Sequence, residues 1–208
     1  MDHHKRTPGH VKRVGLFGGT FDPIHLGHLI LAQAALEELD LDRLVFIPAE
    51  VSPYKKEHPP HVTPGDRLEM IRLAIDGESR FSVDDRELQR EGPSYTIETV
   101  RSLMGDYPGV RFIYLIGADN VADLSGWQES DELKSLIDFA VFTRADTREE
   151  KMSDFPLIRR RIDISSTEIR ERLAKGHSVR YFLPPFVQDY ITTHRLYRSS
   201  LSNDQVQA

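Results

Sequence analysis

The sequence of 208 residues contains no cysteine. Disulfides, a thiolate nucleophile and zinc–thiolate sites are therefore excluded, and a reducing compartment is compatible with this composition. No apolar run reaches the roughly 18 residues that a membrane-spanning helix needs, and the first ten residues (MDHHKRTPGH) lack the apolar segment of a secretory signal. We therefore expect a cytoplasmic protein with no membrane partner.

An excess of positive charge is also missing. The chain has 27 Lys and Arg against 33 Asp and Glu, which gives a formal net charge of −6. A general nucleic-acid binder would usually be basic, so we expect no nucleic-acid partner. A nucleotide needs only a local basic cluster, and the acidic total leaves nucleotide binding open.

Apolar segments of strand length alternate with segments of helical periodicity along most of the chain. Strands are predicted at residues 11–17, 43–48, 81–84, 110–117 and 139–143. This alternation predicts an α/β fold, a doubly wound parallel sheet of Rossmann-like type, with a small helical C-terminal part. We find no internal repeat and no dividing linker. The expected organisation is one domain at 11–198 between disordered tails at 1–10 and 199–208.

Polar residues and proline mark the expected helix starts. Thr63, Ser94, Ser130 and Ser165 are candidate N-caps, and Pro64 and Pro185 suit the first turn of a helix. Ser165 and Glu168 have the spacing of a capping box, and Gly176 is placed to end that helix.

The stretch from Gly15 to Leu29, GLFGGTFDPIHLGHL, carries the strongest functional signal. A strand is followed by a turn at Gly18-Gly19-Thr20 and then by a helix that begins near residues 24–27. This order directs free backbone N–H groups and the positive end of a helix dipole at an anion. His25 and His28 are three residues apart in the first helical turn and can face the same place. Gly27 between them is predicted to leave room for a ligand.

A second helix start gathers hydroxyl groups. Ser165, Ser166 and Thr167 open this helix, and Arg170 lies one turn further on. The loop at 49–62 holds Lys55 and Lys56, which are either solvated or close on a phosphate. Together, the two helix N-termini and these cations predict a site for a polyphosphate. The sequence has no GxxxxGK[ST] motif and no GxGxxG motif at the first turn, so a P-loop and a dinucleotide fingerprint are excluded.

Two further segments contain candidate ligand-binding residues. Residues 117–120, GADN, form a predicted small-residue turn with Asp119 at the end of the strongest central strand. Trp127, the only tryptophan, is flanked by Gly126 and Gln128. A tryptophan in such a polar loop is expected to be partly exposed and able to stack on a planar ring.

These motifs resemble those of a known family. HLGH at 25–28, after GGTFDP at 18–23, resembles the HxGH signature of the nucleotidyltransferase superfamily, and SSTEIR at 165–170 resembles its second signature. SYTIET at 94–99, GADN at 117–120 and LSGW at 124–127 are similar to segments of bacterial nicotinate mononucleotide adenylyltransferases. The resemblance runs from about residue 12 to residue 190. The loop reads SPYKKE where that family often has a His-Lys pair, so which of Lys55 and Lys56 reaches phosphate stays open.

The resemblance implies a reaction of NAD biosynthesis. The 5′-phosphate of nicotinate mononucleotide attacks the α-phosphorus of ATP and yields nicotinate adenine dinucleotide and pyrophosphate. Mg²⁺ is implied as a cofactor, held mainly by ATP phosphates and water, with no metal ligand from the protein.

The resemblance also implies roles for individual residues. The implied catalytic residues are His25, His28 and Arg170. The implied ATP-binding residues are these three together with Gly18, Gly19, Thr20, Phe21, Asp119, Ser165, Ser166 and Thr167. The implied mononucleotide-binding residues are Gly18, Thr20, Lys55, Lys56, Thr96 and Trp127, with Trp127 stacking on the pyridine ring and Thr96 meeting its carboxylate.

Two alternatives remain at this point. Another adenylyl- or cytidylyltransferase of the same superfamily, such as phosphopantetheine adenylyltransferase, would share HxGH, but Thr96 and Trp127 suit a planar acid better. A regulatory nucleotide-binding domain without catalysis is the second alternative, and the presence of both His25 and His28 speaks against it. The sequence leaves open whether the protein is a monomer or a homodimer.

Overall fold

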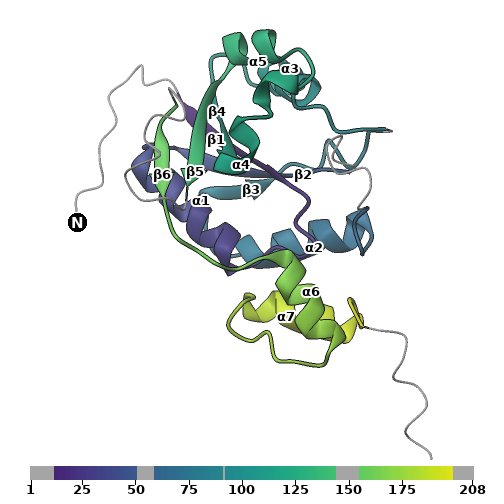
Figure 1. Cartoon of the computed structure of the whole chain (residues 1–208). Helices are drawn as coiled ribbons and strands as arrows, with labels where there is room; N and C mark the ends of the chain where they lie inside the picture. The colour runs from purple at the N-terminus through teal and green to yellow at the C-terminus, as the bar shows by residue number, and fades with distance from the viewer. Residues whose placement is uncertain (1–11, 51–58, 91, 144–154, 199–208) are drawn as a thin grey trace, which may run out of the picture.

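A computed structural model describes residues 12–50, 59–90, 92–143 and 155–198. Within them, six parallel strands form one sheet in the order β3-β2-β1-β4-β5-β6 (Figure 1). The strands are β1 (Arg13–Gly19), β2 (Arg43–Pro48), β3 (Phe81–Val83), β4 (Arg111–Gly117), β5 (Asp138–Thr143) and β6 (Leu157–Arg159). The predicted fold class, a doubly wound parallel sheet, is confirmed.

Helices cover both faces of the sheet. They are α1 (Leu26–Glu38), α2 (Pro64–Ile75), α3 (Thr96–Asp106), α4 (Ala118–Val121), the 3₁₀ turn η1 (Leu124–Gly126), α5 (Ser130–Leu136), α6 (Ser166–Ala174) and α7 (Pro185–Thr193). Figure 1 shows α1 and α2 on one side of the sheet and α3 and α5 on the other, with α6 and α7 together beyond α2. The expected helical C-terminal part is present. None of the helices among the described residues is long and apolar enough to cross a membrane.

The core consists of two apolar clusters, one on each face of the sheet. Phe17 and Phe46 belong to the cluster on the α1 and α2 side, whereas Leu16 and Tyr114 belong to the cluster on the α3 and α5 side. The strand order reverses at β1, whose neighbours are β2 and β4. In doubly wound sheets the carboxyl ends of the strands at such a reversal form the crevice that binds ligands. The end of β1 is therefore the place to look for a site.

The turns predicted after β1 and β4 differ from the structure in their boundaries. Gly18 and Gly19 are the last residues of β1 and not part of the turn, which lies between Thr20 and His25. Of residues 117–120, predicted as a turn, Gly117 ends β4 and residues 118–120 belong to the short helix α4. Strand β6 was not predicted, because three residues at a sheet edge are too few to give a periodic pattern.

Two of the four predicted caps are confirmed. The hydroxyl of Thr63 accepts a hydrogen bond of 3.1 Å from the Asp66 amide at the start of α2. Ser165 does the same for the Glu168 amide at the start of α6, also at 3.1 Å. Gly176 follows the end of α6 with a φ of +71°, as a glycine beyond a helix C-terminus should.

The other two caps were wrong. Tyr95 is the N-cap of α3, and Glu129 is the N-cap of α5. The Ser94 hydroxyl instead accepts a hydrogen bond from the Glu50 amide at 3.0 Å. The Ser130 hydroxyl donates to the Leu124 carbonyl at 2.7 Å. In both cases a partner more distant along the chain replaces the local helix amide.

Candidate active site

The two histidines of the first motif lie against each other at the start of α1. His25 is the N-cap and His28 is in the first turn. Their rings stack with centroids 3.7 Å apart and an interplanar angle of 22°. The His25 amide donates a hydrogen bond to Nδ1 of His28 at 3.2 Å. The prediction that both side chains face the same place is confirmed.

His25 is the more enclosed of the pair. It is 5% exposed, and burial lowers its pKa to about 4. At neutral pH it is therefore an uncharged imidazole, which has one N–H donor and one acceptor nitrogen. Its Nδ1 has no hydrogen-bond partner among the described residues.

Gly27 leaves room for the His25 side chain. A Cβ atom at Gly27 would lie 2.9 Å from Nδ1 of His25 and 3.3 Å from Cγ2 of Ile162. The His25 ring therefore occupies the space beside Gly27, and the expectation that this glycine leaves room for a ligand stays a prediction. Any larger residue would displace the imidazole.

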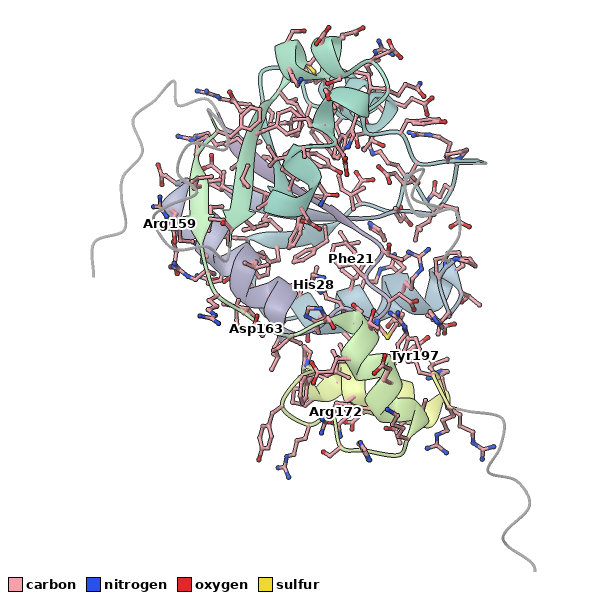
Figure 2. The ribbon with its side chains drawn as sticks, in the orientation of Figure 1. Phe21, His28, Arg159, Asp163, Arg172 and Tyr197 are labelled. Atoms are coloured by element: carbon pink, nitrogen blue, oxygen red, sulfur yellow. The ribbon has the colours of Figure 1, made fainter. Side chains whose placement is uncertain are left out.

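Aromatic rings hold His28 from the other side. The His28 ring meets Phe21 edge to face at 5.0 Å between centroids (Figure 2). It also meets Phe17 edge to face, at 6.0 Å between centroids. Phe21 is 2% exposed and has a φ of +50°, so its ring is part of the core. A contact between Phe21 and ATP would therefore have to use its backbone.

The two glycines at the end of β1 leave room for aromatic side chains of the fold. A Cβ atom at Gly18 would clash with the Tyr114 hydroxyl, and one at Gly19 would lie 2.9 Å from the Phe21 ring. Tyr114 also meets Trp127 edge to face at 5.9 Å. Trp127 is half-buried, as predicted for its exposure, and packs on the α3 and α5 side of the sheet. Gly18 thus faces Tyr114 on the tryptophan side, and Gly19 faces Phe21 on the histidine side.

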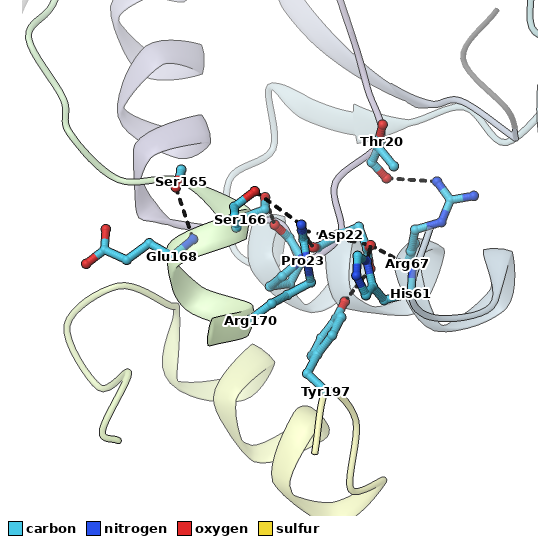
Figure 3. A network of polar contacts seen from close by, with 11 residues as sticks. Thr20, Asp22, Pro23, His61, Arg67, Ser165, Ser166, Glu168, Arg170 and Tyr197 are labelled. Carbon is cyan, nitrogen blue, oxygen red and sulfur yellow. Dashed lines mark hydrogen bonds and ion pairs between the residues drawn. The ribbon is translucent and has the colours of Figure 1, made fainter. Parts of the chain in front are cut away.

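The second motif, 143 or more residues away in sequence, contacts the first (Figure 3). The Ser166 hydroxyl donates to the Pro23 carbonyl at 2.8 Å. The Arg170 guanidinium donates to the Asp22 carbonyl at 2.7 Å and to the Thr167 hydroxyl at 3.2 Å. The structure therefore brings the two predicted helix N-termini and Arg170 together around one turn.

Asp22 contacts residues from several distant segments of the chain, a role that the sequence analysis missed. Its carboxylate, 5% exposed, accepts a hydrogen bond from the His61 amide at 2.8 Å and lies 3.0 Å from Nδ1 of the same residue. The Tyr197 hydroxyl donates to it at 2.7 Å. Burial, reinforced by the Asp22 charge, raises the pKa of Tyr197, so its hydroxyl keeps the proton that it donates. Arg170 lies 4.0 Å from the carboxylate.

Arg67 of α2 was also missed, although the sequence contained a signal for it. Its side chain has no exposed surface, and one of its terminal nitrogens donates to the Thr20 carbonyl at 2.8 Å and to the Ala49 carbonyl at 2.7 Å. Arg67 is three and four residues before Met70 and Ile71, which are fully buried. A charged residue in the apolar stripe of a helix is a position to examine for a buried polar contact.

The remaining predicted residues are dispersed around this centre. Thr96 is the first residue of α3 and is half-buried, and Asp119 in α4 is exposed. Ser165 and Thr167 are exposed at the start of α6. Lys55 and Lys56 lie outside the described residues. No group of three or more His, Cys, Asp or Glu side chains among the described residues could hold a metal ion.

Comparison with known proteins gives consistent matches over most of the chain. The profile of the cytidylyltransferase-like family matches residues 16–172. A probable nicotinate-nucleotide adenylyltransferase of Shouchella clausii is 46% identical over 191 residues, covering 90% of this chain and 97% of the relative. The protein of the same description from Thermus thermophilus is 42% identical and covers 89% of this chain and 100% of its own length.

Solved structures share the fold. A nicotinic acid mononucleotide adenylyltransferase of Plasmodium falciparum, complexed with NaAD, has a TM-score of 0.70 at 22% identity and covers 89% of this chain and 97% of its own. A putative nicotinate-nucleotide adenylyltransferase of Vibrio parahaemolyticus has a TM-score of 0.66 at 21% identity, over 91% and 98% of the two chains.

Proposed function

The chain belongs to the nicotinate-nucleotide adenylyltransferase family, within the cytidylyltransferase-like proteins, and we propose that the site around Asp22 performs that family's reaction. AMP is transferred from ATP to the 5′-phosphate of nicotinate mononucleotide, and pyrophosphate leaves. The assignment to this site depends on one observation, the contact between the two motifs. Arg170 donates to the Asp22 carbonyl and Ser166 donates to the Pro23 carbonyl, just before the paired histidines.

The histidines act by stabilising charge. In phosphoryl-type transfer the protein mainly positions the reactants and donates hydrogen bonds to oxygens on which charge develops. His28 is half-buried, and the neutral, buried His25 stacks on its ring and has a single N–H to donate. In this proposal both hydrogen-bond the phosphate oxygens of ATP. The amides of Gly18, Gly19 and Thr20 line the same cradle.

The start of α6 receives the departing pyrophosphate. Ser165 and Thr167 are exposed there, and the Arg170 guanidinium is fixed by the Asp22 carbonyl. A helix N-terminus with a fixed arginine suits the charge of a β,γ-diphosphate. Mg²⁺ would neutralise charge on those oxygens when bound. Its ligands would be mainly the phosphate oxygens themselves and water.

The mononucleotide lies on the other side of Gly18. Trp127, held edge to face by Tyr114, offers its indole to the pyridine ring. Thr96, in the first turn of α3, offers a hydroxyl and a helix dipole to the pyridine carboxylate. In the same proposal Asp119 lies beside bound nucleotide, and Lys55 and Lys56 approach phosphate.

A comparison of acceptors tests the proposal. Purified protein is incubated with ATP, Mg²⁺ and either nicotinate mononucleotide or phosphopantetheine, and pyrophosphate release is measured together with the mass of the adenylylated product. We expect release with the mononucleotide and formation of nicotinate adenine dinucleotide. Release with phosphopantetheine alone would point to the other transferase, and ATP binding without release would point to a regulatory domain.

A further inference from the structure

A single buried cation joins the ends of two neighbouring strands. Arg67 has no exposed side-chain surface, and one terminal nitrogen donates to the Thr20 carbonyl at 2.8 Å (Figure 3). The same nitrogen donates to the Ala49 carbonyl at 2.7 Å. Thr20 follows β1, and Ala49 follows β2. The second terminal nitrogen lies 3.5 Å from the Glu50 carbonyl. The guanidinium therefore holds the backbones of two loops at a fixed separation.

The segment Ala49–Glu50 is tied on its other sides as well. The Ala49 amide donates to the Gly19 carbonyl at 2.9 Å, and the Glu50 amide donates to the Ser94 hydroxyl at 3.0 Å. Ser94 lies two residues before Thr96, the first residue of α3. The two residues after β2 thus connect the phosphate turn after β1 to the start of α3.

Electrostatics fits a cation at this junction. Burial lowers the pKa of Arg67, but the charges of Glu50 and Asp22 act in the opposite direction. The Glu50 carboxylate lies 3.8 Å from the guanidinium. Compensation of this kind allows a buried arginine to remain charged, and its planar fork can bond several carbonyls at once.

We propose that Arg67 is a positioning residue that sets the separation between the two substrates. It contacts neither of them, because its side chain is enclosed by protein. It acts through the Thr20 carbonyl on the turn that receives ATP, and through Ala49, Glu50 and Ser94 on the side that receives the mononucleotide. This inference rests on the proposed function, since it concerns the alignment of those two reactants.

If Arg67 aligns the two substrates, its loss should lower kcat more than it changes KM. A misplacement of about 1 Å between reacting groups can lower a rate about 10²-fold. Each substrate still meets its own binding groups when the hydrogen bonds of Arg67 are lost. The KM values should therefore change much less than kcat. A purely structural role predicts the opposite pattern, with lower thermal stability and unchanged kcat of the molecules that remain folded.

The experiment compares Arg67→Met, Arg67→Lys and Arg72→Met. Methionine keeps much of the volume but removes all donors, lysine keeps a charge and donors, and Arg72 is an exposed arginine of the same helix whose side chain is 55% exposed. We expect Arg67→Met to lower kcat about 10²-fold with each KM changed less than about threefold. Arg67→Lys should recover part of the loss, and Arg72→Met should match the wild type.

A loss of turnover must be separated from a loss of stability. Activity is normalised to the folded fraction at a temperature well below each Tm, and wild-type kcat in folded Arg67→Met would overturn the proposal. If Arg67→Met does not fold, Arg67→Lys and Ser94→Ala take its place, and wild-type kcat in both would overturn it equally.

Hydrogen exchange separates this inference from the proposed function. Without substrates, faster exchange in peptides covering 18–25 and 44–50 is expected for Arg67→Met and not for Arg72→Met. Unchanged exchange in Arg67→Met would overturn the proposed positioning role of Arg67, whichever substrate the wild type uses. Absence of wild-type turnover with nicotinate mononucleotide would instead contradict the proposed function.

Discussion

The Tyr197 hydroxyl donates a hydrogen bond of 2.7 Å to the carboxylate of Asp22, a residue 175 positions earlier in the chain. This bond attaches the end of the helical C-terminal part to the turn between β1 and α1. The Asp22 carboxylate also accepts a hydrogen bond from the His61 amide, and the Asp22 backbone carbonyl accepts one from the Arg170 guanidinium. One buried carboxylate therefore connects the C-terminal part to the candidate active site.

Tyr197→Phe is expected to destabilise the protein by about 1–2 kcal/mol, because a buried carboxylate loses one donor while the rest of the ring remains. The measurement is the free energy of unfolding in urea at pH 7. Tyr181→Phe is the matched control, since Tyr181 is 79% exposed. Equal stability of Tyr197→Phe and the wild type would mean that the bond contributes nothing to the fold.

His25 should make the protein less stable in mild acid. Burial lowers its pKa to about 4, from 6.5 in the unfolded chain. The unfolded state therefore takes up a proton first as the pH falls, and stability is lost between about pH 6.5 and pH 4. From these two values, the contribution lost at pH 5 relative to pH 7 is about 2 kcal/mol.

The test is the difference in unfolding free energy between wild type and His25→Gln at pH 7 and at pH 5. Carboxylates titrate in both proteins and cancel in this difference. We expect the pH dependence to be weaker in His25→Gln. His194→Gln, at an exposed position, should retain the wild-type dependence. An identical dependence in His25→Gln would show that His25 is not buried as a neutral base.

The local parts of the site could be predicted from the sequence. The order of β1, turn and α1, the facing histidines and the Ser165 cap each depend on residues within a few positions of one another. Short-range geometry is enough to fix them, because helix periodicity and cap spacing are local properties.

The connections could not be predicted in the same way. Ser94 has a suitable local amide to cap, yet it bonds Glu50, which is 44 residues away. The bond between Tyr197 and Asp22 leaves no pattern in either segment. Such partners are chosen by packing in three dimensions, and a single sequence does not record them. Arg67 is the intermediate case, since its helical position indicated burial but not which carbonyls it would reach.

His28→Ala is expected to lower kcat by about 10²–10³ while the protein remains folded. The ring is half-buried among Phe17, Phe21 and His25, and loss of a preorganised donor to transition-state charge typically has an effect of this size. Steady-state rates of pyrophosphate release, with circular dichroism as the folding check, provide the measurement. Near-normal turnover of the variant would remove His28 from the catalytic residues.

Arg170→Ala should raise the KM for ATP more than the KM for the mononucleotide, and kcat should fall as well. The guanidinium is fixed by the Asp22 carbonyl at the start of α6, where the polyphosphate is proposed to bind. Arg172→Ala, an arginine of the same helix that donates to the Ser178 carbonyl, is the control and should leave both constants close to wild type. If only the constant for the mononucleotide changed, the two phosphate regions would have been assigned in the wrong order.

The enzyme should prefer nicotinate mononucleotide over the amide, nicotinamide mononucleotide. Stacking on Trp127 cannot separate them, because the ring is the same, so discrimination must come from groups that meet the carboxylate. Thr96 is the first residue of α3, where the helix dipole favours an anion. A site built from donors satisfies a carboxylate, which only accepts hydrogen bonds, but leaves an amide NH₂ facing other N–H groups.

A mismatch of this kind is on the order of 10²-fold or more in kcat/KM. The measurement is kcat/KM for both mononucleotides at saturating ATP, for the wild type and for Thr96→Val, which keeps the shape of the side chain but removes its hydroxyl. The variant should lose activity mainly with the acid, so that the ratio of the two constants falls. Thr192→Val, at an exposed position on α7, should keep the wild-type ratio. Equal constants for the two substrates in the wild type would refute the carboxylate site while leaving adenylyl transfer intact, because the histidines and Arg170 act on ATP and do not meet the pyridine ring.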